Sequence, residues 1–391
     1  MNVLCVAGAR PNFVKIAPIV HALARREVTT TLVHTGQHYD QAMSQVFFDE
    51  LGLRAPDHFL GAGSGTQAEQ TSAVMTAFEA VVGEVEPDAV VVVGDVNSTV
   101  AAAMVAAKAG ALVVHVEAGL RSRDWAMPEE INRVVTDRLS DLLLAPSADA
   151  VNNLAAEGYR TDQIHLVGNV MIDTLVANLE SARSRRVASR LELADRYGVV
   201  TLHRPSNVDH PETLAGIVTA LATISNDLPL VFPAHPRTVP LLDGLKEQCD
   251  PGQLRVIEPL GYLDFLGLVD GSTLVLTDSG GVQEETTVVG VPCLTLREST
   301  ERPITVTQGT NQVVGTDPEH IVEAATRALA IDHRPCQPDG WDGAAAARSV
   351  EVILAALSEP DRPRPTDLVP DFHATEDNRT STPDLEADLH R

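Results

Sequence analysis

Short apolar runs alternate with helix-length amphipathic segments over roughly the first 345 residues, and this alternation limits the folds open to the chain. Six runs in the first half have the length and the apolar composition of buried strands: Val3–Ala7, Thr30–Val33, Ala89–Val93, Leu112–Glu117, Leu142–Ala145 and Ile164–Val167. Helix-length stretches lie between them, among them Pro11–Ala24, Gln67–Val82 and Thr99–Lys108. Strands that alternate with helices form a parallel sheet with crossover helices, so we expect an α/β fold.

The pattern begins again in the second half of the chain. Five further runs are expected to form strands: Val199–Leu202, Leu230–Phe232, Leu254–Ile257, Leu274–Thr277 and Cys293–Leu296. A chain of 391 residues also exceeds the roughly 250 to 300 residues at which one hydrophobic core stops growing. We therefore predict two doubly wound, Rossmann-like domains over residues 1–168 and 169–340, with the ligand site in the cleft between them.

The end of the chain divides into two parts. Residues 341–358 have the apolar spacing of a last helix, which is expected to cross back and complete the first domain. Residues 360–391 are rich in Pro, Asp and Thr and have almost no hydrophobic period, so we expect a disordered acidic tail.

Charge and cysteine content exclude several classes of protein. The formal net charge of −25 argues against nucleic acid and anionic membrane surfaces as partners. No apolar run approaches the roughly 20 residues of a membrane helix and the first residues lack a signal-peptide pattern, so a cytoplasmic location is expected. The four cysteines form no C-x-x-C pair, which argues against a zinc site or a disulfide framework. Cys5 and Cys293 lie in apolar runs and are expected to be buried, inert thiols.

Candidate anion ligands follow the first strand. Gly8-Ala9-Arg10-Pro11 turns from that strand into a helix, and Lys15 lies one helical turn beyond Pro11. The free N–H groups at the start of the helix and the two cations, Arg10 and Lys15, are expected to converge there. Gly and Pro are also common in such turns for backbone reasons alone, so this prediction depends on the two cations.

Three acidic residues follow neighbouring strands of the first half. Asp95 comes after Ala89–Val93, Glu117 ends the next run, and Glu129 lies in the first turn of a later helix. Each has a structural explanation: Asp95 could cap a helix, although Ser98 is better placed, and Glu is favoured in a first turn by the helix dipole. Together they predict general acids and bases beside the carboxyl ends of the strands.

The second half carries similar signals. His203 follows its first strand, and His235 and Arg237 follow the next, so two strand ends carry potential phosphate ligands. A lone histidine is more often structural than catalytic, but neighbouring His-plus-Arg strand ends favour a functional interpretation.

The most specific feature of the second half is Thr277-Asp278-Ser279-Gly280-Gly281, in which a strand runs into Ser-Gly-Gly and then a helix. Backbone N–H groups, the helix dipole and the Ser279 hydroxyl would form an anion cradle. Glu285, on that helix, could bind ribose hydroxyls, and Arg302 adds a cation in a polar loop.

No motif calls for NAD, ATP or a metal, so we expect no cofactor. The chain has no G-x-x-x-x-G-K-[ST] loop, and its histidines lack metal-ligand spacing. The segment Gly61-Ala62-Gly63-Ser64-Gly65 is expected to follow no strand, and it does not complete G-x-G-x-x-G.

Nine segments, taken in order, closely resemble the non-hydrolysing UDP-N-acetylglucosamine 2-epimerases: GARPNFVKIAPI, HTGQHYD, GDVNST, HVEAGLRS, PEEINR, LHRPSNVD, PAHPRT, TDSGGVQEE and TERP. The match spans roughly residues 1–358. The resemblance implies a GT-B-type fold, in which two Rossmann-like domains face each other, and a homodimer. It also implies anti elimination of UDP from UDP-GlcNAc, giving bound 2-acetamidoglucal, and re-addition to give UDP-ManNAc.

The resemblance also implies roles for single residues. The family's acid/base carboxylates fall on Asp95, Glu117 and Glu129, and His203 is a fourth catalytic candidate. The family's contacts to UDP fall on the following residues: Arg10, Lys15, His203, Ser279, Gly280, Gly281 and Glu285. Further candidate substrate contacts lie in the matched segments: Arg133, His235, Arg237 and Arg302. Gln37 and His38 match a segment with which some bacterial members bind a second UDP-GlcNAc, so they are candidate allosteric residues.

The chain departs from the family pattern at two places. Ile304 follows the proline of TERP where members commonly have Glu, and Thr286-Thr287 stands where Ala-Pro is common. Three alternatives stay open at this point: a glycosyltransferase on the same fold, a hydrolysing 2-epimerase that releases ManNAc and UDP, and a catalytically silent sugar-nucleotide sensor.

Overall fold

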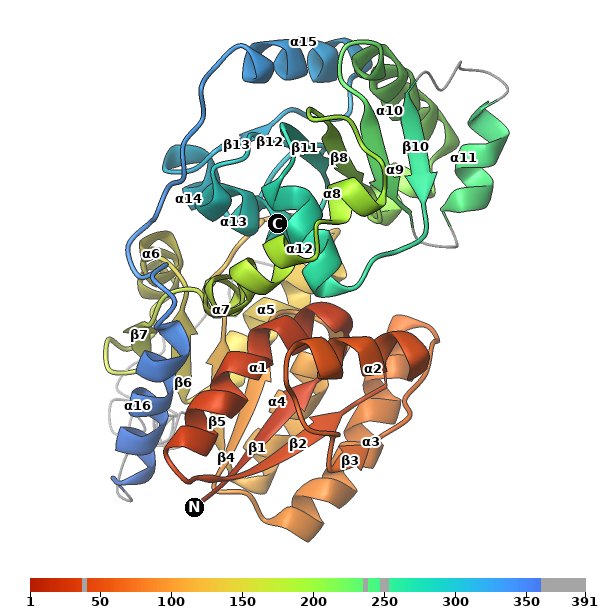
Figure 1. Cartoon of the computed structure of the whole chain (residues 1–391). Helices are drawn as coiled ribbons and strands as arrows, with labels where there is room; N and C mark the ends of the chain where they lie inside the picture. The colour runs from red at the N-terminus through yellow and green to blue at the C-terminus, as the bar shows by residue number, and fades with distance from the viewer. Residues whose placement is uncertain (37–40, 235–237, 247–252, 360–391) are drawn as a thin grey trace, which may run out of the picture.

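The chain folds into two α/β domains, one above the other in Figure 1, each built on a parallel sheet. The computed structural model describes residues 1–36, 41–234, 238–246 and 253–359. The first sheet has the order β3-β2-β1-β4-β5-β6-β7 and the second the order β10-β9-β8-β11-β12-β13. In each sheet the first three strands run outward in one direction and the later strands in the other, which is the doubly wound order of Rossmann-like domains. The predicted fold class, two such domains in a GT-B-type arrangement, is confirmed.

The elements of the first domain alternate along the chain. Its strands are β1 (Asn2–Ala7), β2 (Thr29–His34), β3 (His58–Phe59), β4 (Ala89–Val93), β5 (Leu112–Val116), β6 (Leu142–Ala145) and β7 (Ile164–Leu166). Its helices are α1 (Arg10–Arg25), α2 (Gln41–Glu50), α3 (Gln67–Val85), α4 (Asn97–Ala109), α5 (Pro128–Leu139) and α6 (Ala148–Ala156).

The second domain follows after two connecting helices, α7 (Val170–Ser184) and α8 (Val187–Arg190). Its strands are β8 (Gly198–Thr201), β9 (Leu230–Pro233), β10 (Leu254–Ile257), β11 (Leu274–Thr277), β12 (Cys293–Thr295) and β13 (Asn311–Val313). Its helices are α9 (Pro205–Val208), α10 (Pro211–Ser225), α11 (Val239–Lys246), α12 (Tyr262–Asp270), α13 (Gly280–Val289), α14 (Pro303–Thr307) and α15 (Pro318–Leu329), and the last helix of the chain is α16 (Ala345–Leu357).

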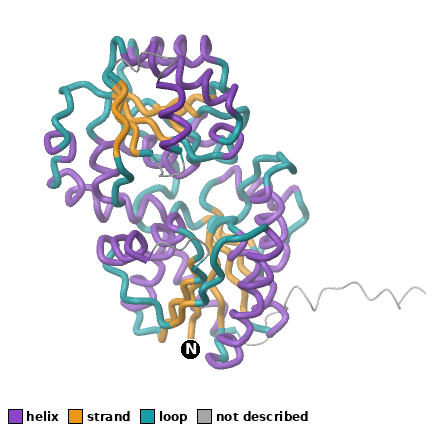
Figure 2. The backbone as a smooth tube through the Cα atoms, turned by 90° about the vertical axis from the view of Figure 1, so that its right-hand side faces the viewer, coloured by secondary structure: helices purple, strands orange, loops and turns teal. Residues whose placement is uncertain are grey.

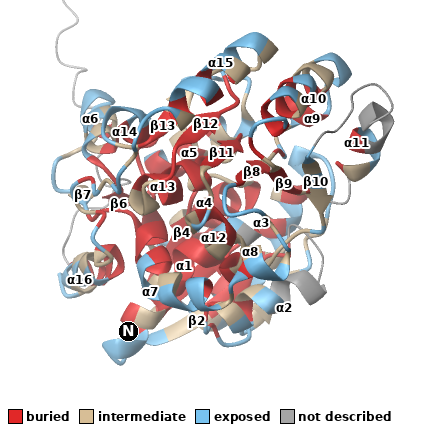
Figure 3. Ribbon diagram, turned by 45° about the horizontal axis from the view of Figure 1, so that its top comes forward, coloured by how far each residue is buried: buried red, intermediate tan, exposed pale blue. Residues whose placement is uncertain are grey.

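Helices cover the sheets, and the strands lie inside (Figure 2). All five residues of β4 are buried, as a strand in a parallel sheet covered on both faces requires. The burial pattern repeats in the second domain, where β11 is fully buried (Figure 3). The thiols of Cys5 and Cys293 are completely buried as predicted, and burial raises the pKa of each to about 12.

Two short strands at sheet edges were not predicted from the sequence. β3 has two residues and β13 has three, and neither forms an apolar run that stands out in the sequence. Because β3 ends just before Gly61, the expectation that the Gly61–Gly65 segment follows no strand was wrong.

The last helix lies beside the first domain in Figure 1 and packs against α1. Its first two N–H groups, those of Ala345 and Ala346, donate to the carboxylate of Asp173 on α7 at 3.0 and 2.7 Å. The helix begins at Ala345, so the expectation that it includes residue 341 was wrong. Trp341 is instead a buried anchor, whose indole Nε1 donates to the carbonyl of Pro146 at 3.1 Å.

The expected acidic tail, residues 360–391, lies outside the described residues. Among the helices that the structure describes, none combines the length and the apolar character needed to span a membrane.

Candidate active site

The two domains meet at the carboxylate of Glu117, which follows β5 directly. Lys15 of α1 donates to its Oε2, and Arg302 of the second domain donates from Nη2 to its Oε1 at 2.7 Å. All three side chains are buried. Two cations, one from each domain, therefore fix one carboxylate at the end of β5.

The backbone at this point is unusual. Glu117 has φ +73°, in the left-handed region that non-glycine residues adopt at a cost of about 1 to 3 kcal/mol. Gly94, after the neighbouring strand β4, has φ +70°, and a Cβ there would lie 3.2 Å from Lys15 Nζ and 3.3 Å from Glu117 Oε2. Glycine at position 94 thus lets the ion pair lie against the backbone, and such retained strain is typical of functional sites.

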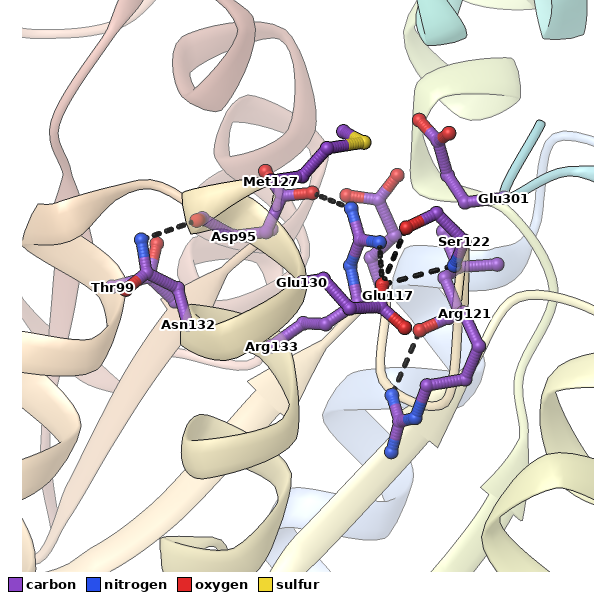
Figure 4. A network of polar contacts seen from close by, with 12 residues as sticks. Asp95, Thr99, Glu117, Arg121, Ser122, Met127, Glu130, Asn132, Arg133 and Glu301 are labelled. Carbon is purple, nitrogen blue, oxygen red and sulfur yellow. Dashed lines mark hydrogen bonds and ion pairs between the residues drawn. The ribbon is translucent and has the colours of Figure 1, made fainter. Parts of the chain in front are cut away.

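Asp95 follows Gly94 and forms an ion pair with Arg133 of α5 (Figure 4). Its side chain is 27 % exposed. Burial raises the pKa of Asp95, but the positive charges of Arg133 and Lys15 and the hydrogen bond from Arg133 outweigh burial and hold the pKa below 3.8. Asp95 is therefore ionised at neutral pH.

The loop that carries Asp95 is held by amides. Asn132 Nδ2 donates to the carbonyl of Asp95 at 3.0 Å and to Oδ1 of Asn97 at 3.1 Å. Neither Asp95 nor Ser98 caps the following helix, because α4 begins at Asn97 and its N-cap residue, Val96, makes no side-chain cap. The Ser98 hydroxyl lies 2.7 Å from that of Thr35 instead.

Arg133 pairs with Glu130 as well as with Asp95, and Glu130 was not singled out from the sequence. Glu130 is buried, and its carboxylate accepts the backbone N–H group of Ser122 at 2.9 Å (Figure 4). It also accepts the backbone N–H group of Arg123 at 2.9 Å. The signal that could have identified it is its i,i+3 spacing from Arg133. Glu129, which was singled out, is half-buried and makes no side-chain hydrogen bond or ion pair with any described residue. Its carboxylate is therefore available to a ligand.

In the second domain, Asp278 orients His203. The imidazole Nδ1 of His203 lies 2.8 Å from Asp278 Oδ1, and the N–H groups of His203 and Arg204 donate to the same carboxylate at 3.0 and 2.9 Å. Burial raises the pKa of Asp278, but the His203 charge and these hydrogen bonds outweigh it and lower the pKa. The pairing with Asp278 fixes the orientation of the ring through Nδ1. The His203 side chain is 56 % exposed.

The predicted anion cradle lies at the start of α13. Ser279 is its N-cap residue and makes no side-chain cap, so its hydroxyl is not used in that way. A Cβ on Gly280 would lie 2.7 Å from Arg302 Cζ, and one on Gly281 would lie 2.9 Å from Met171 Cε. Glycine at position 280 therefore allows Arg302 to lie against the first turn of the helix.

Arg302 is surrounded by carboxylates. Besides Glu117 it pairs with Glu301 and, through Nε at 2.9 Å, with Glu284. Burial raises the pKa of Glu284 to about 7, although Arg302 opposes the shift. Glu285, the predicted ribose contact, is 3 % exposed, and burial raises its pKa to about 7 while the neighbouring Tyr262 hydroxyl lowers it.

Several predicted site residues fall outside the described part of the chain: Gln37, His38, His235 and Arg237. Arg10 begins α1, but its side chain also lies outside that part. No cluster of three or more His, Cys, Asp or Glu side chains among the described residues could hold a metal ion.

Comparison with known proteins gives a consistent result. The sequence profile of the family described as UDP-N-acetylglucosamine 2-epimerase matches residues 21–354. The chain is 41 % identical over 365 residues to the UDP-N-acetylglucosamine 2-epimerase of Methanocaldococcus jannaschii, covering 90 % of this chain and 99 % of that protein. It is 40 % identical over 365 residues to the UDP-2,3-diacetamido-2,3-dideoxy-D-glucuronate 2-epimerase of Pseudomonas aeruginosa, covering 91 % and 100 %.

Solved structures match over the same length. The crystal structure of the M. jannaschii enzyme in complex with UDP-GlcNAc and UDP has a TM-score of 0.85 at 40 % identity and covers 91 % of this chain and 100 % of that one. Another structure of the same enzyme has a TM-score of 0.74.

Proposed function

Because the chain belongs to the UDP-N-acetylglucosamine 2-epimerase family, we propose that it interconverts UDP-GlcNAc and UDP-ManNAc without net hydrolysis. The observation that supports this most is the position of Glu117, held between Lys15 of its own domain and Arg302 of the other. An ionised Asp95 lies in the same electrostatic environment, since Lys15 also lowers its pKa. Carboxylates and cations from both domains thus meet where a sugar carbon and its leaving diphosphate would have to be handled together.

The proposed first step is anti elimination. Asp95 is the leading candidate to remove the C2 proton, because it is ionised at neutral pH. As the proton leaves, the C1–O bond breaks, its electron pair departs with UDP, and a C1–C2 double bond forms in 2-acetamidoglucal. Glu117, Glu129 and His203 are the proposed partners in proton transfer.

The departing diphosphate gains charge as the C1–O bond breaks, so the site must stabilise that charge in the transition state. Lys15 and Arg302 supply positive charge. The N–H groups of Ser279, Gly280 and Gly281 lie at the start of α13, where the helix dipole favours anions. Arg10, Arg133, His235 and Arg237 are proposed as further contacts, and Glu285 as the ribose contact.

The second step re-adds UDP to the glycal with inversion at C2. A β-phosphate oxygen of UDP attacks C1 on the face from which it left, and the C1–C2 double bond takes up a proton at C2, on the face opposite to the one from which the first proton was removed. The step consumes no redox equivalent and no water. The buried contact between Glu117 and Arg302 supports a site that excludes water from the glycal, which is why we propose the non-hydrolysing reaction.

The decisive experiment is proton NMR of UDP-GlcNAc with the purified enzyme in D2O. We expect UDP-ManNAc to form, the C2 proton signal to be replaced by deuterium, and UDP not to accumulate. Lasting accumulation of UDP with free ManNAc would identify a hydrolysing epimerase. Product without deuterium at C2 would exclude elimination, and a requirement for an acceptor sugar would identify a glycosyltransferase.

A second candidate substrate follows from the P. aeruginosa relative, which is as similar to this chain as the M. jannaschii enzyme. That relative is a 2-epimerase of a UDP-linked 2,3-diacetamido uronic acid, so the chemistry at C2 is the same and the substituents at C3 and C6 differ. A kcat/KM higher for that sugar nucleotide than for UDP-GlcNAc would replace the first candidate.

We also propose a homodimer on the basis of the family resemblance. Light scattering should give about twice the 41.7 kDa of one chain, and a particle of 41.7 kDa would contradict this.

A further inference from the structure

A cavity of about 370 Å³ lies next to the loop that joins β5 to α5. Three arginines line it, Arg121, Arg123 and Arg138, together with Trp125 and Tyr159. Two carboxylates, Glu130 and Glu157, also line it, and each of them is paired with an arginine. Its volume is in the range of small-molecule sites, which begin at about 300 Å³. Among the described residues that contact Asp95 or its partner Arg133, only Glu130 also lines the cavity.

Two of the three arginines have no carboxylate partner in the part of the chain that the structure describes. Arg121 pairs with Asp137 at 2.7 Å and with Glu157 through two bonds of 2.8 and 2.7 Å. Arg138 instead lies over the ring of Tyr159, 5.2 Å from its centre. Arg123 donates to the side-chain oxygen of Asn153 at 3.0 Å. Neither of the last two pairs with a carboxylate of a described residue.

These uncompensated charges stand out on a chain with a net charge of −25. Two guanidinium groups match the charge of a phosphate monoester, which is about −1.5 to −2 at pH 7, and their planar donors fit its oxygens. The volume leaves room for an organic group beyond the phosphate. Trp125, which is 65 % exposed, offers a flat apolar surface for that group.

We propose that this cavity is a second, regulatory site for a small phosphate monoester. Sugar phosphates and nucleoside monophosphates share this chemistry. The site is separate from the proposed UDP-sugar site, because its arginines lie on the β5–α5 loop and on α5 and contact none of the proposed UDP ligands.

Two chains of contacts lead from the cavity to Asp95. In the first, Glu130 binds the N–H groups of Ser122 and Arg123 and pairs with Arg133, which pairs with Asp95 (Figure 4). A ligand held by Arg123 would therefore act on the backbone of Ser122 and Arg123, which positions Glu130 beside Arg133.

The second chain is fully buried. Arg121 pairs with Asp137, whose Oδ1 lies 2.6 Å from Nδ1 of His115. The other ring nitrogen of His115 donates to the carbonyl of Gly94 at 2.9 Å, directly before Asp95. Both chains end at the Gly94–Asp95 turn, so occupancy of the cavity is expected to change turnover.

The test uses the fluorescence of Trp125. The chain has two tryptophans, and the other, Trp341, is buried. Wild-type enzyme with saturating UDP, which fills the proposed active site, is titrated with glucose 6-phosphate, AMP or inorganic phosphate at constant ionic strength. We expect a saturable change, with at least one ester binding about tenfold or more tightly than inorganic phosphate. The ester that binds more tightly shows whether the ligand is a sugar phosphate or a nucleoside monophosphate.

Matched variants locate the binding. In Arg123→Gln/Arg138→Gln the apparent Kd is expected to rise at least tenfold, whereas Arg327→Gln, at an exposed arginine of the second domain, should leave it unchanged. Trp125→Phe should abolish the fluorescence change. Equal affinity in the double variant and the wild type, no saturable change, or phosphate binding as tight as both esters would overturn the proposal.

The effect on turnover rests on the proposed function, whereas binding does not. The tighter ester should change the rate of UDP-GlcNAc epimerisation at least threefold in the wild type and leave the double variant unaffected. An unchanged rate in an active, ester-bound wild type overturns the regulatory role. A wild type that binds the ester but does not epimerise overturns the proposed function instead.

Discussion

Arg302 of the second domain donates from Nη2 to Oε1 of Glu117 in the first domain at 2.7 Å. The same guanidinium pairs with Glu284 and Glu301, so its position is fixed by three buried carboxylates. The orientation of a candidate proton-transfer group therefore depends on a residue of the opposite domain. Moving the two domains apart would therefore also break the contact that orients Glu117.

Arg302→Met tests this dependence. The variant leaves buried carboxylates without their counter-charge, so we expect stability to fall by about 3 to 5 kcal/mol and kcat/KM by about 100- to 1000-fold. Urea denaturation and the epimerisation assay measure the two effects. Arg327→Met, whose arginine is 62 % exposed, serves as the control and should change stability by less than about 0.5 kcal/mol. Near-wild-type kcat/KM in Arg302→Met would show that the cross-domain contact has no part in the reaction.

Arg133→Gln tests the ionisation of Asp95. Burial raises the pKa of Asp95, and Arg133 is the first of the charges that lower it, so removing Arg133 should raise this pKa. If Asp95 acts as the base, it must be ionised, and the acid limb of the kcat/KM profile should move to higher pH in the variant. Asp95→Asn should lower C2 exchange in D2O by about 100-fold or more at every pH. An acid limb at the same pH in Arg133→Gln and the wild type would contradict the assignment of Asp95.

Glu285→Gln tests the buried carboxyl below the anion cradle. Burial raises the pKa of Glu285 from 4.5 to about 7. A raised folded-state pKa stabilises the protein fully below the unfolded-state value, and this stabilisation is lost as pH rises through the folded-state value. Between pH 5 and pH 8 the wild type should therefore lose up to about 3 kcal/mol more stability than the glutamine variant. Parallel stability–pH curves of the wild type and Glu285→Gln would contradict a pKa of Glu285 that is raised by burial.

Much of the fold could be predicted because buried parallel strands are continuous apolar runs. The bounds of β4, β6, β10 and β11 are those of the predicted runs. The edge strands β3 and β13 were missed because two or three residues paired on one side need no apolar run.

The candidate site was predictable where chemistry follows a strand end, as for Asp95 and Glu117. It was not predictable where a partner comes from a distant segment. Asp278 and Glu284 were missed, because each acquires its importance from a contact that only the folded chain makes. Glu130 was missed although its i,i+3 spacing from Arg133 is visible in the sequence. The left-handed backbone of Glu117 has no sequence signal either, since it is imposed by the packing around it.

Gly280→Ala tests the close approach of Arg302 to the first turn of α13. The added Cβ would lie 2.7 Å from Arg302 Cζ and 2.9 Å from Glu301 Oε1, and the guanidinium cannot move aside without leaving its carboxylates. We expect stability to fall by about 1 to 3 kcal/mol, as for other overpacked sites, and kcat/KM to fall at least tenfold. Gly83→Ala is the control, because a Cβ there meets no atom within 4 Å and alanine at this position in α3 should be neutral or stabilising by about 1 kcal/mol. Full kcat/KM in both variants would show that the packing of Arg302 against glycine is not required for the reaction. The guanidinium of Arg302 would then have to act from more than one position.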